Sequence, residues 1–290
     1  MSASSVSAPV APAAAGTRLP VFYISHGGGP WPWMAGMVQG PYARLAQSLA
    51  RLPADAGGAP RAILMVSAHW EEPAFTVQAH PHPPMVYDYY GFPQDTYAIE
   101  YPAPGDAALT RRVVELLQTA GLPVAVDAER GFDHGMFAPM AVAYPRADMP
   151  VVQLSLRTGL DPAEHLALGR ALAPLRDEGI LIIGSGLSYH NLRAFGPAAL
   201  GASSAFDQWL RTTMALPAAE REAALRHWEQ APAARLAHPR EEHLLPLMVA
   251  AGAAPDEVGE LVYHEDRFMG GVTASSFRLG APARQAPAPA

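Results

Sequence analysis

Two apolar segments of the chain run directly into a histidine that stands among small residues. Leu19–Ile24 precedes Ser-His26-Gly-Gly-Gly, and Ala62–Val66 precedes Ser-Ala-His69. Continuous apolar runs of this length are typical of strands buried on both faces of a parallel sheet. In open α/β sheets, the carboxyl ends of such strands face the crevice where ligands bind. We therefore expect a sheet that brings His26 and His69 together at one of its ends.

Strand-like and helix-like segments alternate along most of the chain. Further strands are predicted at 75–79, 124–126, 151–156, 180–183, 261–264 and 275–279. Helices are predicted at 41–52, 106–120, 136–143 and 161–175, and most of 203–251 looks helical. Because a helix separates the first two strands, we expect these strands to pair in parallel as a β-α-β unit. The pattern predicts an α/β fold in a single domain, 19–280, with a mainly parallel central sheet flanked by helices.

The segments outside this domain have a different composition. Residues 1–18 and 281–290 are rich in alanine and proline, and we expect both to be disordered tails, the first of them no signal peptide. The longest strongly apolar helical stretch, 244–254, is too short to span a bilayer. We therefore expect a cytoplasmic protein.

The composition narrows the chemistry that the chain can perform. The 290 residues carry a formal net charge of -7, which argues against nucleic acid or an anionic membrane as a partner. Cysteine and lysine are both absent, so thiolate nucleophiles, thiolate zinc sites, Schiff-base lysines and P-loop lysines are excluded. A catalytic metal would have to be held by nitrogen and oxygen donors, and neutral imidazole is the commonest of these.

Segment 80–104 is a long loop rich in proline and tyrosine. Loops of this length in a compact domain are usually either functional or disordered. Its five tyrosines and Phe92 favour an ordered wall or lid beside a site.

Three further histidines lie in similarly marked places. His134 stands in Phe-Asp-His-Gly, and His190 follows the strand 180–183 and a glycine turn. Each of these two could hold its loop by a hydrogen bond or could move protons at neutral pH. Glu241, Glu242 and His243 are consecutive at a helix start, so they cannot all face one crevice. Either His243 or Glu242 could complete a three-ligand metal site with His26 and His69.

The remaining histidines and one competing motif are given structural interpretations. His80 and His82 are interpreted as rim residues, and four histidines are treated as structural, namely His165, His227, His238 and His264. His-Gly-Gly-Gly also occurs in the oxyanion hole of lipase-like hydrolases, but that enzyme class needs a Gly-x-Ser-x-Gly motif. Ser185 lies directly between two glycines, which is the wrong spacing, so a serine hydrolase is disfavoured.

Several motifs, in order along the chain, resemble those of one enzyme family. The chain is similar to the class III extradiol ring-cleavage dioxygenases of the DOPA 4,5-dioxygenase type over residues 19–280. The motifs are Ser25-His-Gly-Gly-Gly-Pro30, Ser67-Ala-His-Trp-Glu71, Tyr87-Asp-Tyr-Tyr-Gly-Phe-Pro93, Tyr101-Pro-Ala-Pro-Gly105, Asp133-His-Gly135, Pro150-Val-Val-Gln-Leu-Ser155, Gly184-Ser-Gly186 with His190-Asn-Leu192, and Glu242-His-Leu-Leu-Pro246. Many members have His-Gly-Ser-Pro where this chain has His-Gly-Gly-Gly-Pro, which leaves the histidine intact but alters the pocket wall.

The resemblance implies a function and roles for individual residues. It implies that His26, His69 and His243 hold the metal, with Glu242 as the alternative to His243 because better-studied relatives use a carboxylate as third ligand. It makes His190 the acid/base residue or a further ligand, and His134 a second polar contact to substrate or oxygen. The implied cofactor is non-haem Fe(II), with zinc able to occupy the site.

The reaction that the resemblance implies is ring opening of a small aromatic diol. O2 would convert a catechol to a muconic semialdehyde, with no nucleic acid or membrane partner. Two alternatives stay open at this point: a zinc-dependent hydrolase with Glu242 as base, and a non-catalytic metal-binding protein on the same fold.

Overall fold

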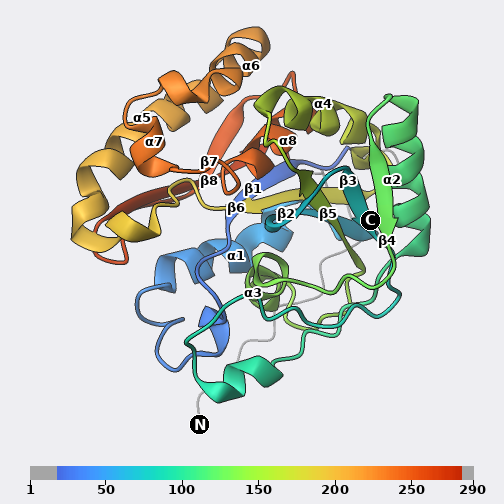
Figure 1. Cartoon of the computed structure of the whole chain (residues 1–290), viewed down its shortest axis with the longest axis horizontal. Helices are drawn as coiled ribbons and strands as arrows, with labels where there is room; N and C mark the ends of the chain where they lie inside the picture. Colours follow the sequence, from blue (N-terminus) through green and yellow to red (C-terminus); the bar gives the residue numbers. More distant parts are fainter. Residues whose placement is uncertain (1–17, 283–290) are drawn as a thin grey trace, which may run out of the picture.

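The computed structural model describes residues 18–282, and its centre is a strand of seven buried residues. This strand, β6 (Ile180–Gly186), is fully buried and lies in the middle of an eight-stranded sheet (Figure 1). The order across the sheet is β4-β3-β5-β2-β6-β1-β8-β7. The other strands are β1 (Val21–Ser25), β2 (Ala62–Glu72), β3 (Phe75–Gln78), β4 (Val124–Asp127), β5 (Val151–Arg157), β7 (Gly259–Phe268) and β8 (Val272–Leu279).

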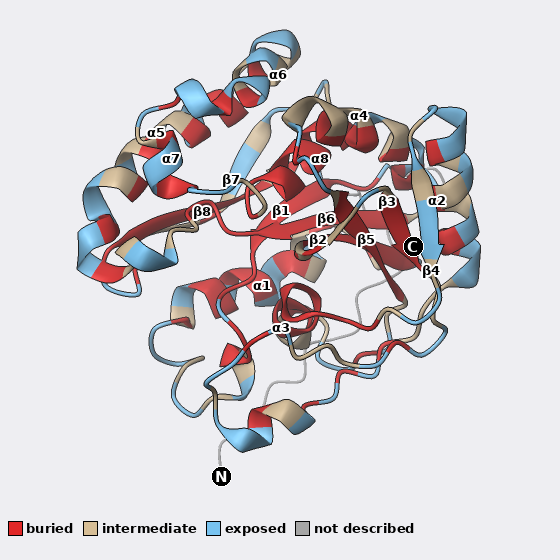
Figure 2. Ribbon diagram, in the orientation of Figure 1, coloured by how far each residue is buried: buried red, intermediate tan, exposed pale blue. Residues whose placement is uncertain are grey.

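The four central strands run parallel, which confirms the predicted α/β fold. β6 pairs in parallel with both β1 and β2, and β2 pairs in parallel with β5. The antiparallel pairings join β1 to β8, β8 to β7 and β3 to β5. These aliphatic central strands are buried because helices cover both faces of the sheet, as the red strands in Figure 2 show.

One expected pairing is wrong: β1 and β2 do not pair with each other. β6 lies between them, so Ser185 is the register partner of both Ile24 and Ser67. Local spacing predicts that two strands are parallel, but the choice of neighbours depends on the packing of the whole sheet. The consequence for the site is that His26 and His69 approach each other from either side of β6.

The helices form two layers. α1 (Ala43–Asp55) and α3 (His134–Ala143) cover one face, whereas α4 (Pro162–Leu172) and α8 (Leu245–Ala253) cover the other (Figure 1). The remaining α-helices of the described residues are α2 (Ala107–Thr119), α5 (Leu200–Met214), α6 (Ala218–Arg226) and α7 (Ala234–Ala237). The predicted helices are therefore present, with ends shifted by a few residues where capping and short 3-10 turns decide them.

Local chemistry explains where two of these helices lie. Asp106 accepts hydrogen bonds from the backbone N–H groups of Ala108 and Leu109 and so begins α2. α8 passes directly over β6 because residue 184 is glycine: a Cβ there would lie 2.2 Å from the carbonyl oxygen of Pro246. This close crossing brings the turn that precedes α8 to the carboxyl end of β6.

Among residues 18–282, no helix is both long and apolar enough to cross a bilayer. The tails predicted at 1–18 and 281–290 lie outside the described residues, except for residues 18, 281 and 282.

Candidate metal centre

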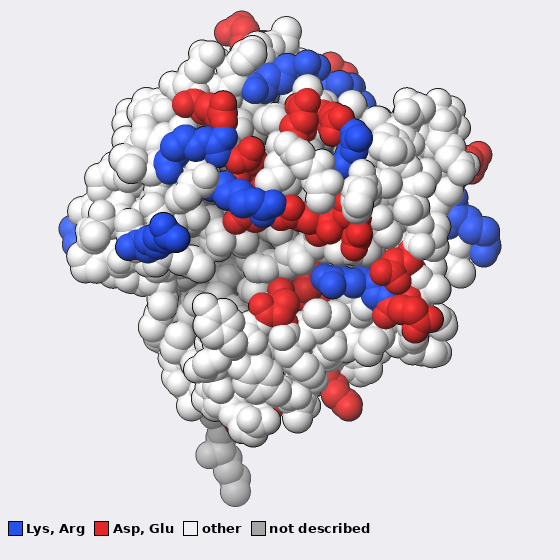
Figure 3. Space-filling view, in the orientation of Figure 1, with Lys and Arg blue, Asp and Glu red and all other residues white. Residues whose placement is uncertain are grey.

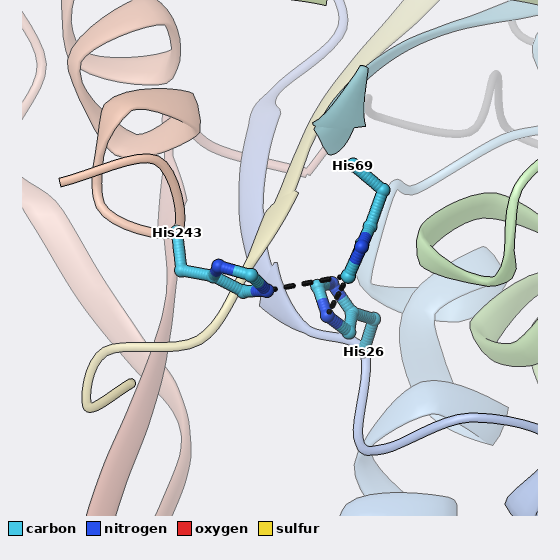
Figure 4. Close-up of side chains that lie close together, drawn as sticks. All are labelled: His26, His69 and His243. Atoms are coloured by element: carbon cyan, nitrogen blue, oxygen red, sulfur yellow. Dashed lines mark hydrogen bonds between the residues drawn. The ribbon is translucent and has the colours of Figure 1, made fainter. Parts of the chain in front are cut away.

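Three histidine rings meet at the carboxyl end of the central strands. The Nε2 atom of His69 lies 3.1 Å from Nε2 of His26 and 3.2 Å from Nε2 of His243 (Figure 4). All three atoms could serve as ligands of one ion, because they lie within 4.8 Å of one another. The structure thus brings together the three histidines that the sequence singled out for metal binding.

Each ring comes from a different segment, and an irregularity in the backbone of β2 orients one of them. His26 directly follows β1, and His243 lies in the turn before α8. His69 lies within β2, where the pairing with β5 changes register between Val66 and Glu71, rather than beyond the strand's end as the sequence suggested. Such a bulge redirects side chains, so it turns His69 toward β6.

Small residues allow these segments to approach one another. A Cβ at Gly186 would lie 2.1 Å from the carbonyl oxygen of His243, so only glycine lets the His243 turn cross the end of β6. Gly27 has a positive φ of 80°, and a Cβ there would lie 2.5 Å from the indole nitrogen of Trp31. That nitrogen donates a hydrogen bond to the carbonyl oxygen of His26, which holds the loop that carries the ligand.

The polar neighbours of the three rings indicate which nitrogen carries the proton. Nδ1 of His243 donates to the carboxylate of Glu242 (2.9 Å), and Nδ1 of His69 faces the carboxylate of Asp88 at 3.2 Å. The hydroxyl of Ser185 donates to the carbonyl oxygen of Gly135, so its oxygen accepts from Nδ1 of His26 (3.0 Å). A proton on each Nδ1 leaves a lone pair on each Nε2. Three lone pairs therefore point at one place, which is unfavourable unless a cation lies between them.

The spacing of the Nε2 atoms fits a transition metal. Ligands bound at about 2.0–2.1 Å, with angles near 90–110°, lie roughly 2.8–3.4 Å apart. The observed separations from His69, 3.1 and 3.2 Å, fall in this range. Three nitrogens on one side of an ion leave its other positions open, which is the arrangement of catalytic rather than structural sites.

Burial keeps the three rings in the neutral form that binds metal. Burial first, and then the proximity of the other histidines, lower the pKa of His26 and of His243 well below the usual value. The same causes lower the pKa of His69 to about 3, although the nearby carboxylate of Asp88 opposes the shift. At neutral pH a metal therefore does not have to displace protons from this cluster.

His190 lies against His243 rather than among the convergent nitrogens. The two rings are stacked, with centroids 3.3 Å apart and planes inclined by 18°. Nδ1 of His190 donates to the same oxygen of Glu242 that accepts from His243, at 2.9 Å in each case. Burial raises the pKa of Glu242, but the hydrogen bond with His190, a backbone hydrogen bond and the charges of His190 and Arg240 together outweigh it, and the net shift is downward. Glu242 thus lies on the Nδ1 side of His243, where it orients two rings.

On the other side of the cluster, His134 and Asp88 form a matching pair. Nδ1 of His134 donates to Oδ1 of Asp88 at 2.8 Å, and the ring centroid of His134 is 4.0 Å from that of His69. The sequence singled out His134 but missed Asp88, which lies between two tyrosines in a loop without periodicity. Its signal in the sequence is its place in the motif Tyr87–Pro93, where it is the single acidic residue among aromatic ones.

A buried polar network supports the strand that carries His69. Asp133 is fully buried, and its carboxylate accepts from the hydroxyl of Ser67 (2.7 Å), from the amide of Gln153 (2.9 Å) and from Arg130 (3.1 Å). The Ser67 oxygen in turn accepts from the backbone N–H of His69. The carboxylate therefore has several partners, as a buried charge requires.

Segment 80–104 forms the ordered wall that its composition predicted. Tyr89 is 8% exposed and packs against the rings of His134, Phe137 and Phe92. Phe92 in turn lies against Gly29, where a Cβ would be 2.7 Å from its ring. The segment is therefore held against both the glycine loop after His26 and the helix α3.

An ion pair joins two of the segments that carry the convergent histidines. Both terminal nitrogens of Arg240 donate to the carboxylate of Glu71, at 2.5 Å each, which joins the turn before His243 to the strand that carries His69. Figure 3 shows side chains of both signs gathered around a hollow on this face.

Histidines treated as structural from the sequence have local partners away from the centre. His165 contacts the carbonyl oxygen of Asp161, His238 that of Ser188, and His264 the hydroxyl of Ser275. The Nδ1 atom of His80 accepts from the backbone N–H of His82.

Comparisons with known proteins agree with this geometry. Residues 20–279 match the family described as the catalytic LigB subunit of aromatic ring-opening dioxygenase. The chain is 38% identical over 283 residues to a protein named dioxygenase tasH from Hapsidospora irregularis, with 88% of this chain and 85% of the relative covered. It is 34% identical over 269 residues to a 4,5-DOPA dioxygenase extradiol from Escherichia coli strain K12, with 91% and 96% covered.

A plant relative and a solved structure extend the comparison. A 4,5-DOPA dioxygenase extradiol from Beta vulgaris is 43% identical over 210 residues, covering 71% of this chain and 78% of the relative. A crystal structure of an uncharacterized Escherichia coli K12 protein superposes with a TM-score of 0.74 at 31% identity, covering 91% of this chain and all of that one. The predicted enzyme class is confirmed, and the zinc hydrolase and the non-catalytic protein are not retained. The chain belongs to the LigB family of aromatic ring-opening dioxygenases, as a class III extradiol dioxygenase of the DOPA 4,5-dioxygenase type.

Proposed function

We propose that this dioxygenase opens the ring of a catechol-type diol with O2 and forms a muconic semialdehyde. The observation that carries the proposal is the convergence of three unprotonated Nε2 atoms between two histidines that are each held by a carboxylate. A diol has two adjacent oxygens to bind and two protons to lose. A metal held by the three histidines would bind the oxygens, and the imidazoles of His190 and His134 face the protons.

His26, His69 and His243 would hold the metal, which we propose to be Fe(II). Imidazole donors suit both iron and zinc. Iron(II) supplies the redox couple through which a diol and O2 can react, whereas zinc has none. The zinc-loaded protein is therefore expected to be inactive as an oxygenase.

His190 is proposed as the acid/base residue. Because its Nδ1–H donates to Glu242, its Nε2 carries a lone pair and can take a proton from a diol hydroxyl. Glu242 then stabilises the imidazolium, as the carboxylate does in a Ser-His-Asp triad. The same proton can be returned when the ring opens.

His134 is proposed as the second polar contact. Its Nδ1–H donates to Asp88, so its Nε2 also carries a lone pair and can accept a hydrogen bond from the second hydroxyl. Once protonated, the same nitrogen can donate to an oxygen atom of the substrate or of O2. Tyr89, whose ring lies against that of His134 and is backed by Phe137, would provide an apolar surface for an aromatic ring.

Anaerobic reconstitution tests the proposal. The metal-free protein is loaded with Fe(II) or with Zn(II), mixed with a panel of substituted catechols, and followed by O2 uptake and visible absorption. We expect one O2 consumed per catechol, and a yellow ring-opened product, with iron only. Iron-loaded protein that consumes no O2 with any catechol would refute the assignment. The cytoplasmic location stays a prediction, which cell fractionation tests.

A further inference from the structure

We propose that Asp88 is a positioning residue of the metal centre. Its carboxylate holds the ring of His69 in the form that binds metal and the ring of His134 in the form that meets substrate. It also ties both rings to segment 80–104. The proposal rests on the proposed function in so far as His69 is taken as a metal ligand.

The contacts of Asp88 reach both rings at once. Oδ1 accepts from Nδ1 of His134 (2.8 Å) and from the backbone N–H of His134 (3.1 Å), while Oδ2 lies 3.2 Å from Nδ1 of His69. The side chain is 17% exposed, so these interactions are only partly screened by water. One carboxylate therefore faces three nitrogens that can each present a proton.

Backbone pairing places Asp88 beside His134. The backbone N–H of Val86 donates to the carbonyl oxygen of Phe132, and the N–H of Phe132 donates to that of Pro84, both at 2.7 Å. This short bridge fixes segment 80–104 two residues before Asp88 and two residues before His134. The position of Asp88 is thus determined by the same pairing that positions the start of α3.

The start of α3 gives the carboxylate a second reason to lie there. His134 is the first residue of the helix, and its N–H is one of the groups that an α-helix leaves without an internal partner. The side chain of Asp133 forms no capping bond, and Asp88 satisfies the N–H of His134 instead. The positive end of the helix dipole favours a carboxylate at this place.

Only a group with acceptors on both sides suits these neighbours. In Asp88→Asn, the amide oxygen would keep the two donors of His134, and the NH2 group would face Nδ1 of His69. His69 could then pair with it only by moving its proton to Nε2, the atom that points at the metal position. Asparagine is therefore expected to oppose metal binding actively, whereas alanine merely removes the support.

A titration with Co(II), followed by its visible absorption bands, tests the proposal without any turnover. The proteins compared are wild type, Asp88→Asn, Asp88→Ala and the control Asp95→Asn, which changes an exposed residue of the same segment. We expect Asp88→Asn to weaken Co(II) binding about 10–100-fold, as loss of a carboxylate behind a ligand histidine typically does. Asp88→Ala should weaken it less, and Asp95→Asn should leave it unchanged.

The order of the two variants separates positioning from a general structural role. If Asp88 only stabilised the loop, alanine would be at least as harmful as asparagine, and that result would overturn the proposal, as would wild-type affinity in Asp88→Asn. Thermal unfolding of the metal-free proteins checks that each variant is folded before titration. Wild type that binds Co(II) but never turns over catechols would refute the proposed function and leave this inference standing.

Discussion

Two carboxylates flank the three convergent nitrogens, but they hold their histidines in different ways. Asp88 uses one oxygen for His134 and the other for His69, so both of its oxygens are engaged. Glu242 uses a single oxygen for both His190 and His243. Among the described residues, its second oxygen has no hydrogen-bond partner, and Arg240 is 3.7 Å away. The two positions should therefore respond differently to the same change from acid to amide.

Glu242→Gln should spare the metal and impair turnover. The amide oxygen can still accept from both rings, so His243 keeps its orientation and metal affinity should stay within a few-fold of wild type. The lost charge no longer stabilises protonated His190, so kcat should fall about 10–100-fold, which is less than the roughly 10²–10⁴-fold that removing an acid/base group usually costs. Metal titration and steady-state O2 uptake measure the two effects separately. Equal losses in affinity and kcat would contradict the assigned geometry.

Removing His190 or His69 should separate catalysis from metal binding. His190→Ala should retain stoichiometric iron and lose about 10²–10⁴-fold in kcat, because the acid/base group is gone. His69→Ala should lose the metal itself, because only two convergent nitrogens remain. Metal analysis after gel filtration, beside activity assays, tells these outcomes apart. If both variants retain iron equally, the roles are assigned wrongly.

At this scale the sequence predicted the histidines and missed the residues that orient them. His26, His69, His134, His190 and His243 are recognisable because each stands at the end of an apolar run or in a short motif. Their supporting partners are recognisable only in space. Asp88 lies in an aperiodic loop, and the shared bond of Glu242 joins residues 52 positions apart. No local pattern carries such information.

At the scale of elements, glycines decide how closely segments cross the sheet. Gly184 and Gly186 alternate with Ser185 on β6, and both lie under the chain that leads through His243 into α8. Ser185, between them, holds His26. The Gly-Ser-Gly motif therefore combines two close crossings with one polar contact, an explanation that the sequence alone did not provide.

Gly186→Ala should distort the site from a distance. The new Cβ would lie 2.1 Å from the carbonyl oxygen of His243, so the turn must move. We expect lower stability, by about 1–3 kcal/mol as for overpacked cores, and weaker metal binding. Gly201→Ala is the matched control, since no heavy atom lies within 4 Å of its Cβ and alanine favours a helix. Urea unfolding and Co(II) titration check both; wild-type metal affinity in Gly186→Ala would contradict the crossing.

The order of the strands marks the limit of what the sequence predicted about the fold. Strand and helix positions follow from periodicity and capping, and most were correct. The neighbours in the sheet were not, because β6 enters between β1 and β2 from more than a hundred residues later in the chain. Its four aliphatic residues suit the most buried place in the sheet, but several strands share that property.

At the scale of the whole molecule, buried histidines outside the convergent trio make the fold sensitive to acid. Burial is the main cause that lowers the pKa of His165 to about 4 and that of His238 to about 3. In the unfolded chain both return to about 6.5, so the unfolded state binds more protons between these values. The stability that they contribute is complete above pH 6.5 and is lost as the pH falls toward 4 and 3.

Stability of the metal-free protein should therefore decrease on mild acidification. Each of the two histidines contributes a slope of about 1.4 kcal/mol per pH unit below pH 6. In the metal-free protein His26, His69 and His243, whose pKa values burial also lowers, add to this slope. Urea unfolding at pH 7.5, 6.0 and 5.0 in the presence of a chelator measures it. In His165→Gln the slope should be smaller by about that amount. A free energy of unfolding that does not change between pH 7.5 and 5.0 would be inconsistent with neutral buried rings.

The place of β6 has a consequence for how this protein can diverge. Neighbouring strands are about 4.8 Å apart, so the backbones of β1 and β2 are separated by roughly twice that distance. The distance between the strands that carry His26 and His69 is therefore set by the geometry of the sheet and does not depend on the residues around the site. Evolution, or a protein engineer, can therefore exchange the aromatic segment 80–104 to admit differently shaped rings while the spacing of the three convergent histidines is kept. If Asp88 positions His69 and His134 as proposed, it is the residue of this segment that such an exchange must preserve.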